Sequence, residues 1–506
     1  MKDIKNIVKS KTWVWFWSGN WPMLDNIYDT SPEFQDLFKG LSGTYLKNAA
    51  CFFKDGVATI YHAKEDYEEM EQQFLKNFKE NPRWILNSFK NYKKQTDKDL
   101  EALKKIGQRN FKNMQSSDLA STYIETLKHF TFNAVYDHFN MYIEKFFVPI
   151  LENYLKKRLK ELGEEEKLPY HLNLLLTPQK ESRLFKERQE FFSLVKKVQS
   201  NFKWKQDVLE NKEGEVQKLI AMHAKKHGYL TILVNNPPTT KEQYTEEIKN
   251  YLSNNQSFKI ESVRLGDIFD KKTKKEVKKL IKKLRPSKRI KLLIKGLRET
   301  AFCRTEDNAV MSLSTYYIMP MQKEITKRLG ISYYDLKELV REEIIFFTRF
   351  KQKVSKKLIE DRLRLTLYIS ADKDRYLSTE KEAKWAWNHI HSKTKIDKTA
   401  ELKGMPASIG KATGTAFVAK SSNQLKDFEK GGILIAPATS ADFVPVMRKA
   451  GAIVTEMGGI TSHAGIVSRE FNVPCIVGVK HATSILKTGD KIEVDAHKGI
   501  IKKLKS

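Results

Sequence analysis

Near the C-terminus, a histidine stands where the sequence changes from a strand-like to a helix-like pattern. A run of apolar residues over 452–455 leads into two glycines, and the apolar residues beyond the histidine recur at helical spacing. An asparagine and a proline then follow, as is common where a short helix ends. These signals place His463 in the first turn of a helix that begins at Thr461 or Ser462.

An imidazole in the first turn of a helix can do chemistry with anions. A hydroxyl group at Thr461 or Ser462 can cap free backbone N–H groups, and the positive end of the helix favours negative charge. Gly458 and Gly459 allow the backbone to approach such an anion closely. His463 could therefore carry a phosphoryl group on a ring nitrogen. The same spacing also fits a polar residue that does no more than cap the helix.

The stretch resembles the phosphohistidine signature of the phosphoenolpyruvate-utilising enzymes, a group that contains phosphoenolpyruvate synthase, pyruvate phosphate dikinase and rifampin phosphotransferase. That signature has two glycines, a spacer, a Thr or Ser, a spacer, the histidine, small residues, two aliphatic residues, a small residue and an arginine. Every element is present between Gly458 and Arg469, and Gly465 stands where alanine is usual. The likeness extends over roughly residues 404–503.

The resemblance implies a role for each residue of the signature. His463 would carry the phosphoryl group, while Thr461 and Ser462 would contact its oxygens. Arg469 would stabilise its charge, although six positions along a helix place it on another part of the surface. Glu470 shares the face of His463 more nearly and could instead orient the ring.

Length and charge limit the classes of protein that this chain can represent. At 506 residues it is too long for one core, so two to four domains are expected. The net charge of +29 suits nucleic acid, acidic membranes or phosphorylated ligands as partners. It fits equally well an organism whose proteins are rich in lysine.

Three scattered cysteines form no framework, which favours a reducing, intracellular setting. No stretch approaches the ~20 apolar residues that span a bilayer. The aromatic run near the N-terminus is too short for a signal peptide. The chain is therefore expected to be cytoplasmic.

Residues 1–235 are predicted to form a mostly helical domain with an aromatic-rich N-terminus. Alternation over 13–17 fits a strand, the spacing of Trp13 and Trp17 fits a helix face, and the choice stays open. Residues 229–234 form a short β-rich run before a proline break.

Residues 236–392 are predicted to form a second helical segment. Its residues 271–298 include fourteen Lys or Arg among twenty-eight, on a helix with one apolar face. This basic face suits phosphates or nucleic acid, but a solvated surface explains it as well, because no aromatic residues interleave with the charges. His389 and His391 do not share a helix face, so no metal site is predicted in the chain.

A charged linker over 393–403 precedes the clearest domain, residues 404–506, in which strands alternate with two short helices. The predicted fold class is thus multidomain α + α/β. A large, mostly α-helical N-terminal region is followed by a compact C-terminal α/β domain, which the resemblance implies to be a swivelling phosphohistidine domain. His463 is expected at a strand-to-helix junction, where α/β sheets commonly bind ligands.

The glycine-rich loops that bind nucleotide phosphates are missing from the sequence. The first part does not resemble the ATP-grasp domain that phosphorylates the histidine in the relatives. The chain ends 43 residues after His463, which leaves no room for a phosphoenolpyruvate-binding barrel. The order of domains resembles the last two-thirds of rifampin phosphotransferase, in which the helical domain binds the phosphoryl acceptor.

The predicted function is that of a phosphotransferase component. A separate ATP-grasp nucleotide-binding subunit would load His463 from ATP and Mg²⁺, and the acceptor would be pyruvate or another small molecule. No cofactor is predicted to bind this chain directly. One alternative is a non-catalytic binding or regulatory subunit that keeps the carrier fold. A nucleic-acid-binding protein that uses the helix within 271–298 is the other.

Overall fold

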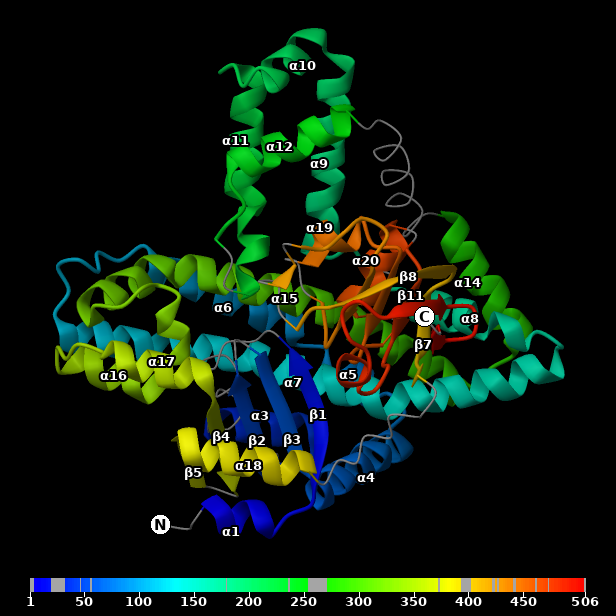
Figure 1. The fold of residues 1–506 in the computed structure, drawn as a ribbon, viewed down its shortest axis with the longest axis horizontal. Coiled ribbons are helices and arrows are strands. Elements are labelled where there is room, and N and C mark those ends of the chain that lie inside the picture. Colours follow the sequence, from blue (N-terminus) through cyan, green and yellow to red (C-terminus); the bar gives the residue numbers. More distant parts are fainter. Residues whose placement is uncertain are drawn as a thin grey trace. The chain divides into compact units, whose positions relative to one another are not determined.

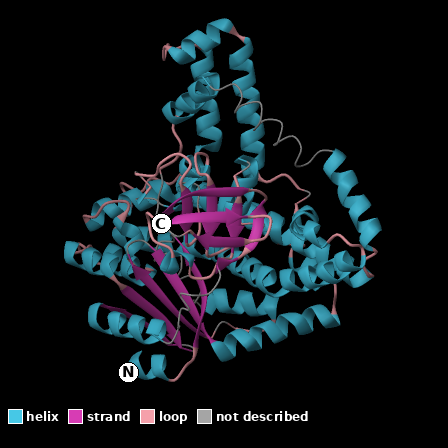
Figure 2. Ribbon diagram, turned by 45° about the vertical axis from the view of Figure 1, so that its right-hand side comes forward, coloured by secondary structure: helices cyan, strands magenta, loops and turns pink. Residues whose placement is uncertain are grey.

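The structure is a computed structural model (Figure 1). It describes residues 4–19, 32–45, 47–54, 57–178, 180–234, 237–253, 271–371, 374–392, 402–420, 424–425, 427–439, 443–459, 462–471 and 473–504. Most of the described residues are helical, and the strands belong to two sheets (Figure 2). Among the helices of the described part, none is both long and apolar enough to cross a bilayer.

The chain divides into two compact units, which are described separately. The first unit consists of residues 1–149 and 317–506, and the second of residues 150–316. The boundaries of the two units fall inside two long helices, α7 (Ser116–Glu161) and α15 (Lys288–Leu329).

The first unit contains an antiparallel sheet of five strands in the order β1-β3-β2-β4-β5 (Figure 1). Its strands are β1 (Trp13–Gly19), β2 (Asn48–Lys54), β3 (Val57–Ala63), β4 (Thr366–Ala371) and β5 (Asp374–Thr379). The tryptophan-rich stretch is therefore a strand. The prediction of a helical segment over residues 236–392 did not include β4 and β5. Strand β4 pairs with a strand more than 300 residues earlier, and Ser370 Oγ accepts from the Ala49 N–H at 3.1 Å.

Both faces of this sheet are covered. On one face, α1 (Ile4–Lys9) and α18 (Glu380–Ser392) pack on buried side chains of the inner strands, among them Phe52 and Leu367. On the other face, Phe16 of β1 stacks on Tyr142 of α7, with ring centroids 4.8 Å apart. The other helices of this unit are α3 (Pro32–Ser42), α4 (Lys64–Glu80), α5 (Trp84–Ser88), α6 (Tyr92–Gly107), η4 (Asp335–Glu338), α16 (Arg341–Arg349) and α17 (Lys356–Arg364).

The second unit is helical throughout its described residues. Besides parts of α7 and α15 it contains η2 (Glu165–Lys167), α8 (Leu168–Leu176), α9 (Arg183–Ser200), α10 (Phe202–Leu209), α11 (Glu215–His227), η3 (Gly228–Val234), α12 (Lys241–Ser253) and α14 (Lys271–Leu284).

One run in this unit departs from its predicted conformation. The expected β-rich run over 229–234 forms the 3₁₀ helix η3, with Tyr229 and Ile232 buried. Short apolar runs do not distinguish strand from helix by periodicity.

The basic helix is present as α14. Val277, Leu280 and Leu284 are buried along one side, and the lysines between them are largely exposed. The helix ends at Leu284 because Arg285 adopts a positive φ of 47° and a proline follows. The predicted amphipathic pattern is confirmed, whereas the role of the basic face stays a prediction.

The described residues of the C-terminal domain form a sheet of eight strands and three short helices. The strand order is β6-β13-β12-β8-β9-β10-β11-β7. The strands are β6 (Leu402–Lys403), β7 (Met405–Ser408), β8 (Lys411–Val418), β9 (Ile433–Ala436), β10 (Ala452–Thr455), β11 (Cys475–Val477), β12 (Lys491–Asp495) and β13 (Ile500–Lys503). The helices are α19 (Val444–Met447), α20 (His463–Phe471) and α21 (Ala482–Ile485).

Strands β8 to β11 are parallel, and both faces of this part of the sheet are covered. Leu434 and Ile453 point into a core that also holds side chains of α19 and α20, while Ile435 and Val454 point into a second core with Ala482 of α21. Parallel strands buried on both faces read as continuous apolar runs, which is why the sequence revealed them. The coarse prediction of a mostly helical chain with a C-terminal α/β domain is confirmed.

Residues 402 and 403, predicted as the end of a linker, belong to this sheet. They form β6, in which Leu402 pairs with Ile501 of β13. The rest of the predicted linker, residues 393–401, lies outside the described residues.

Candidate functional site

The junction between β10 and α20 is the candidate site. Strand β10 ends at Thr455, and α20 begins at His463 and leads back to the parallel strand β11. The start of α20 thus follows the carboxyl end of a central parallel strand, where open α/β sheets place ligands.

Ser462 caps helix α20. Its Oγ accepts a hydrogen bond from the N–H of Gly465 at 3.2 Å, and its own N–H donates to the carbonyl of Gly459 at 3.0 Å. The Ser462 side chain is buried, so this bond is shielded from water. The predicted helix start, with a hydroxyl cap, is confirmed at Ser462, whereas Thr461 lies outside the described residues.

Gly458 and Gly459 differ in what a side chain at each position would meet. Gly458 has a φ of +97°, and a Cβ built on it would lie 2.5 Å from Cβ of Ser462, so no larger residue fits without a shift of the cap. A Cβ built on Gly459 would meet no atom within 4 Å. The close approach of an anion to the backbone at Gly459 stays a prediction.

The loop between β10 and α20 is held at several points. Thr455 Oγ1 donates to the carbonyl of Met457 at 2.7 Å, and the N–H of Met457 donates to the carbonyl of Pro437 at 2.8 Å. The N–H of Val479 donates to the carbonyl of Thr455 at 2.9 Å. These bonds tie the loop to the strands on either side, and so they fix the place where α20 begins.

Glu456, which the sequence analysis did not single out, is a half-buried anchor of the same loop. Its Oε1 accepts hydrogen bonds from the N–H of Thr483 at 2.7 Å and from its Oγ1 at 2.6 Å. Burial raises the pKa of the Glu456 carboxyl, although both Thr483 donors act in the opposite direction. An acid directly after a buried strand was the available signal in the sequence.

Helix α20 is held in place by its buried apolar side chains and by the hydrogen bonds of Ser468. Ala464 and Val467 are buried in the core between α20 and the sheet. The Ser468 hydroxyl donates to the carbonyl of Gly465 at 3.2 Å, and the Ser468 carbonyl accepts from the N–H of Val473 at 2.9 Å. These contacts fix the position of α20, and with it the backbone of His463 in the first turn.

The side chains of His463, Arg469 and Glu470 lie outside the described part of the structure. The backbone places all three on α20, with His463 as its first residue. Which atoms these side chains contact stays a prediction from the resemblance.

Residues 428–499, which include the whole β10–α20 junction, match the family model of the PEP-utilising enzyme, mobile domain. A probable phosphoenolpyruvate synthase of Archaeoglobus fulgidus is 49% identical over 100 residues, which are 20% of this chain and 13% of that protein. The phosphoenolpyruvate synthase of Pyrococcus furiosus is 46% identical over 102 residues, again 20% of this chain and 12% of the relative.

The C-terminal domain therefore contains a mobile domain of the PEP-utilising enzyme type. The matched segment spans only about an eighth of the length of these curated relatives.

Among solved structures, a chain of the aconitase X of Thermococcus kodakaraensis in its holo-form is similar to 21% of this chain and to 99% of its own length, at 23% identity. The TM-score of 0.18 is too low for that likeness to support any inference.

Proposed function

We propose that this chain is a phosphotransferase component that carries a phosphoryl group on His463. A separate ATP-grasp subunit would load the histidine from ATP and Mg²⁺, and the group would pass to pyruvate or another small-molecule acceptor. The observation that carries the proposal is the match of residues 428–499 to the mobile domain, within which His463 opens the capped helix α20.

The chemistry required of the chain is modest. A neutral ring nitrogen of His463 would attack the phosphorus atom, the bond from phosphorus to the nucleotide oxygen would break, and a phosphorus–nitrogen bond would form. Positioning and charge stabilisation supply most of the catalysis in such transfers.

The start of α20 suits the negative charge that the imidazole would then hold. The first backbone N–H groups of a helix have no acceptor within it, and the positive end of the helix dipole favours anions. Ser462 takes the N–H of Gly465, which leaves those of His463 and Ala464 as the groups that we expect to contact the phosphoryl oxygens. Arg469 would add a positive charge, and Thr461 a hydroxyl group.

The carrier role requires the domain to reach two sites in turn. The resemblance implies a swivelling motion, for which residues 393–401 would serve as the linker. Because β6 already belongs to the domain, the linker is proposed to end before Leu402.

The test is phosphorylation of the purified full chain. With ATP, Mg²⁺ and an extract of the source cells, the wild type is expected to acquire an acid-labile, base-stable phosphate. His463→Ala should abolish this label. His497→Ala, which changes an exposed histidine in the β12–β13 turn of the same domain, should leave it intact.

Two results would overturn this proposal. If His463→Ala is labelled as strongly as the wild type, the carrier residue is wrong. If an extract that phosphorylates a known mobile domain leaves the wild-type chain unlabelled, the chain is a non-catalytic binding or regulatory subunit that keeps the carrier fold.

A further inference from the structure

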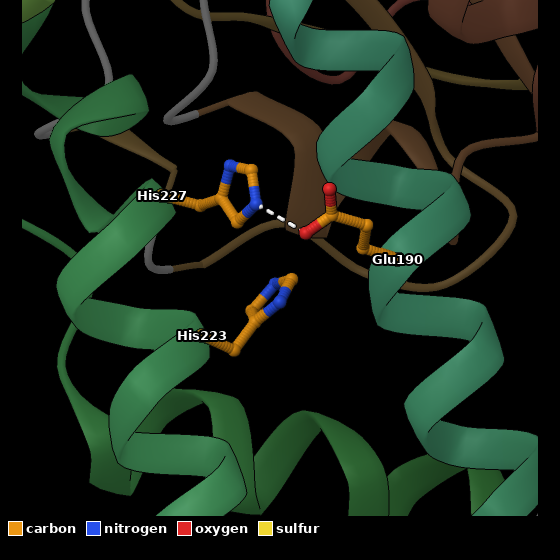
Figure 3. Close-up of side chains that lie close together, drawn as sticks. All are labelled: Glu190, His223 and His227. Atoms are coloured by element: carbon orange, nitrogen blue, oxygen red, sulfur yellow. Dashed lines mark hydrogen bonds and ion pairs between the residues drawn. The ribbon is translucent and has the colours of Figure 1, made fainter.

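The second unit contains a cluster of three side chains of the types that bind metal ions, on helices α9 and α11. Figure 3 shows Glu190 on α9 facing His223 and His227 on α11. One ligand atom from each of the three residues lies within 4.8 Å of the others. The two histidines are four residues apart, so they share one helix face, with ring centroids 4.8 Å apart.

The cluster is buried on its histidine side and open on its carboxylate side. His223 and His227 are 8% and 6% exposed, whereas the side chain of Glu190 is 46% exposed. An ion could therefore enter past Glu190 and be held by the two rings.

Among the described residues, the ring of His227 is hydrogen-bonded through one of its two nitrogens, so the ring can shift toward an ion. Its Nε2 lies 2.8 Å from Glu190 Oε2, while its Nδ1 finds no hydrogen-bond partner among the described residues.

A second layer of polar side chains holds His223 in place. Nε2 of His223 lies 3.2 Å from Oε1 of the buried Glu187, which also accepts from the hydroxyl of Tyr244 at 3.3 Å. Arg188 lies 3.0 Å from the other oxygen of Glu187. Carboxylates in this position commonly orient the histidines of metal sites.

We propose that Glu190, His223 and His227 form a binding site for a divalent transition-metal ion such as Zn²⁺. Two imidazoles and one carboxylate are a donor set that zinc accepts, with a fourth position left for water or another ligand. Ligand atoms at about 2.0–2.2 Å from one tetrahedral ion lie roughly 3.4 Å apart. His227 Nε2 and Glu190 Oε2, now 2.8 Å apart, would therefore separate slightly, while the other ligand atoms, which lie within 4.8 Å, would approach through side-chain shifts of roughly 1 Å. This inference is independent of the phosphoryl-carrier proposal.

Lys226 competes with a metal ion for the carboxylate of Glu190. Its Nζ lies 2.7 Å from both oxygens of Glu190, and its side chain is 61% exposed. Such exposed ion pairs contribute little to stability, so an ion that contacts two imidazoles as well can displace the lysine. Lys226→Ala is therefore expected to tighten metal binding.

The test is calorimetric titration of the full chain with Zn²⁺ after treatment with a chelator. The wild type is expected to bind Zn²⁺ in one saturable step that involves this cluster. Glu190→Gln and His227→Asn should each weaken that step about tenfold or more. His129→Asn, which changes a histidine paired with Asp99 in the first unit, is the matched control and should not weaken it.

A second measurement separates metal binding from a purely structural network. Zn²⁺ should raise the melting temperature of the wild type, because an ion that binds only the folded state stabilises it, and Glu190→Gln should lose this rise while it keeps the wild-type circular dichroism. The proposal fails if the wild type shows no saturable step. It also fails if Glu190→Gln and His227→Asn bind Zn²⁺ as tightly as the wild type.

Discussion

Gly458 and Gly459 are neighbours of the same type, yet their surroundings in the β10–α20 loop differ. Only Gly458 combines a positive φ with a contact that a side chain would violate. The cap that Ser462 forms depends on this contact, because the missing side chain lets Ser462 lie against the turn. At the scale of the residue, the first glycine is needed for structure and the second leaves the site accessible.

Replacement of each glycine by alanine tests this difference. Gly458→Ala is expected to cost about 1–3 kcal/mol, since it forces alanine into a left-handed conformation and against Ser462. Gly459→Ala should cost less than about 1 kcal/mol, because its new methyl group meets open space. Hydrogen exchange of the α20 amides in the full chain measures both effects, and equal loss of protection in the two variants would contradict the distinction.

His62 on β3 shows how an element of the first unit depends on pH. Its Nε2 lies 2.8 Å from the hydroxyl of Tyr142 on α7, and its ring packs edge-on against Phe16 of β1. Burial, with a contribution from Lys145 and His138, lowers the pKa of His62 to about 3. The sheet and α7 are thus joined through an imidazole that stays neutral.

This histidine should make the first unit sensitive to acid. Because the unfolded chain binds a proton near pH 6.5 and the folded chain only near pH 3, stability is lost as the pH falls through this window. The loss is about 1.4 kcal/mol for each pH unit. Urea unfolding at pH 7 and pH 4.5 should therefore show a steeper pH dependence for the wild type than for His62→Gln, and identical slopes would refute the assignment.

At the scale of the whole molecule, the C-terminal domain contains what it needs to fold. All eight strands of its sheet lie between residues 402 and 503, and both of its cores are formed by its own residues. The five-stranded sheet differs, because its inner strand β4 comes from residues 366–371, far from β2 in the chain.

Two truncations test this contrast. A fragment of residues 402–506 should fold cooperatively and give a dispersed amide NMR spectrum. A fragment that ends at residue 365 should lose the first sheet, because β2 would be left with an unpaired edge and Leu367 and Ile369 would be missing from the core. A well-folded short fragment, or an unfolded C-terminal one, would contradict this account.

The sequence by itself determined the parts of this protein whose signals are local. Strand β10 was located from a four-residue apolar run, because both faces of a parallel sheet are buried. The start of α20 at the Ser462 cap followed from glycine, hydroxyl and helical spacing within a dozen residues.

Only the tertiary structure decided the rest. The choice of strand for Trp13–Gly19, and the existence of β4 and β5, depend on pairing between distant segments, which no local window contains. The sequence analysis did not single out His223 and His227, which stand four residues apart on α11, and Glu190 joins them only through the packing of α9 on α11. Long-range contacts of this kind leave no local pattern in the sequence, because the residues that meet are far apart along the chain.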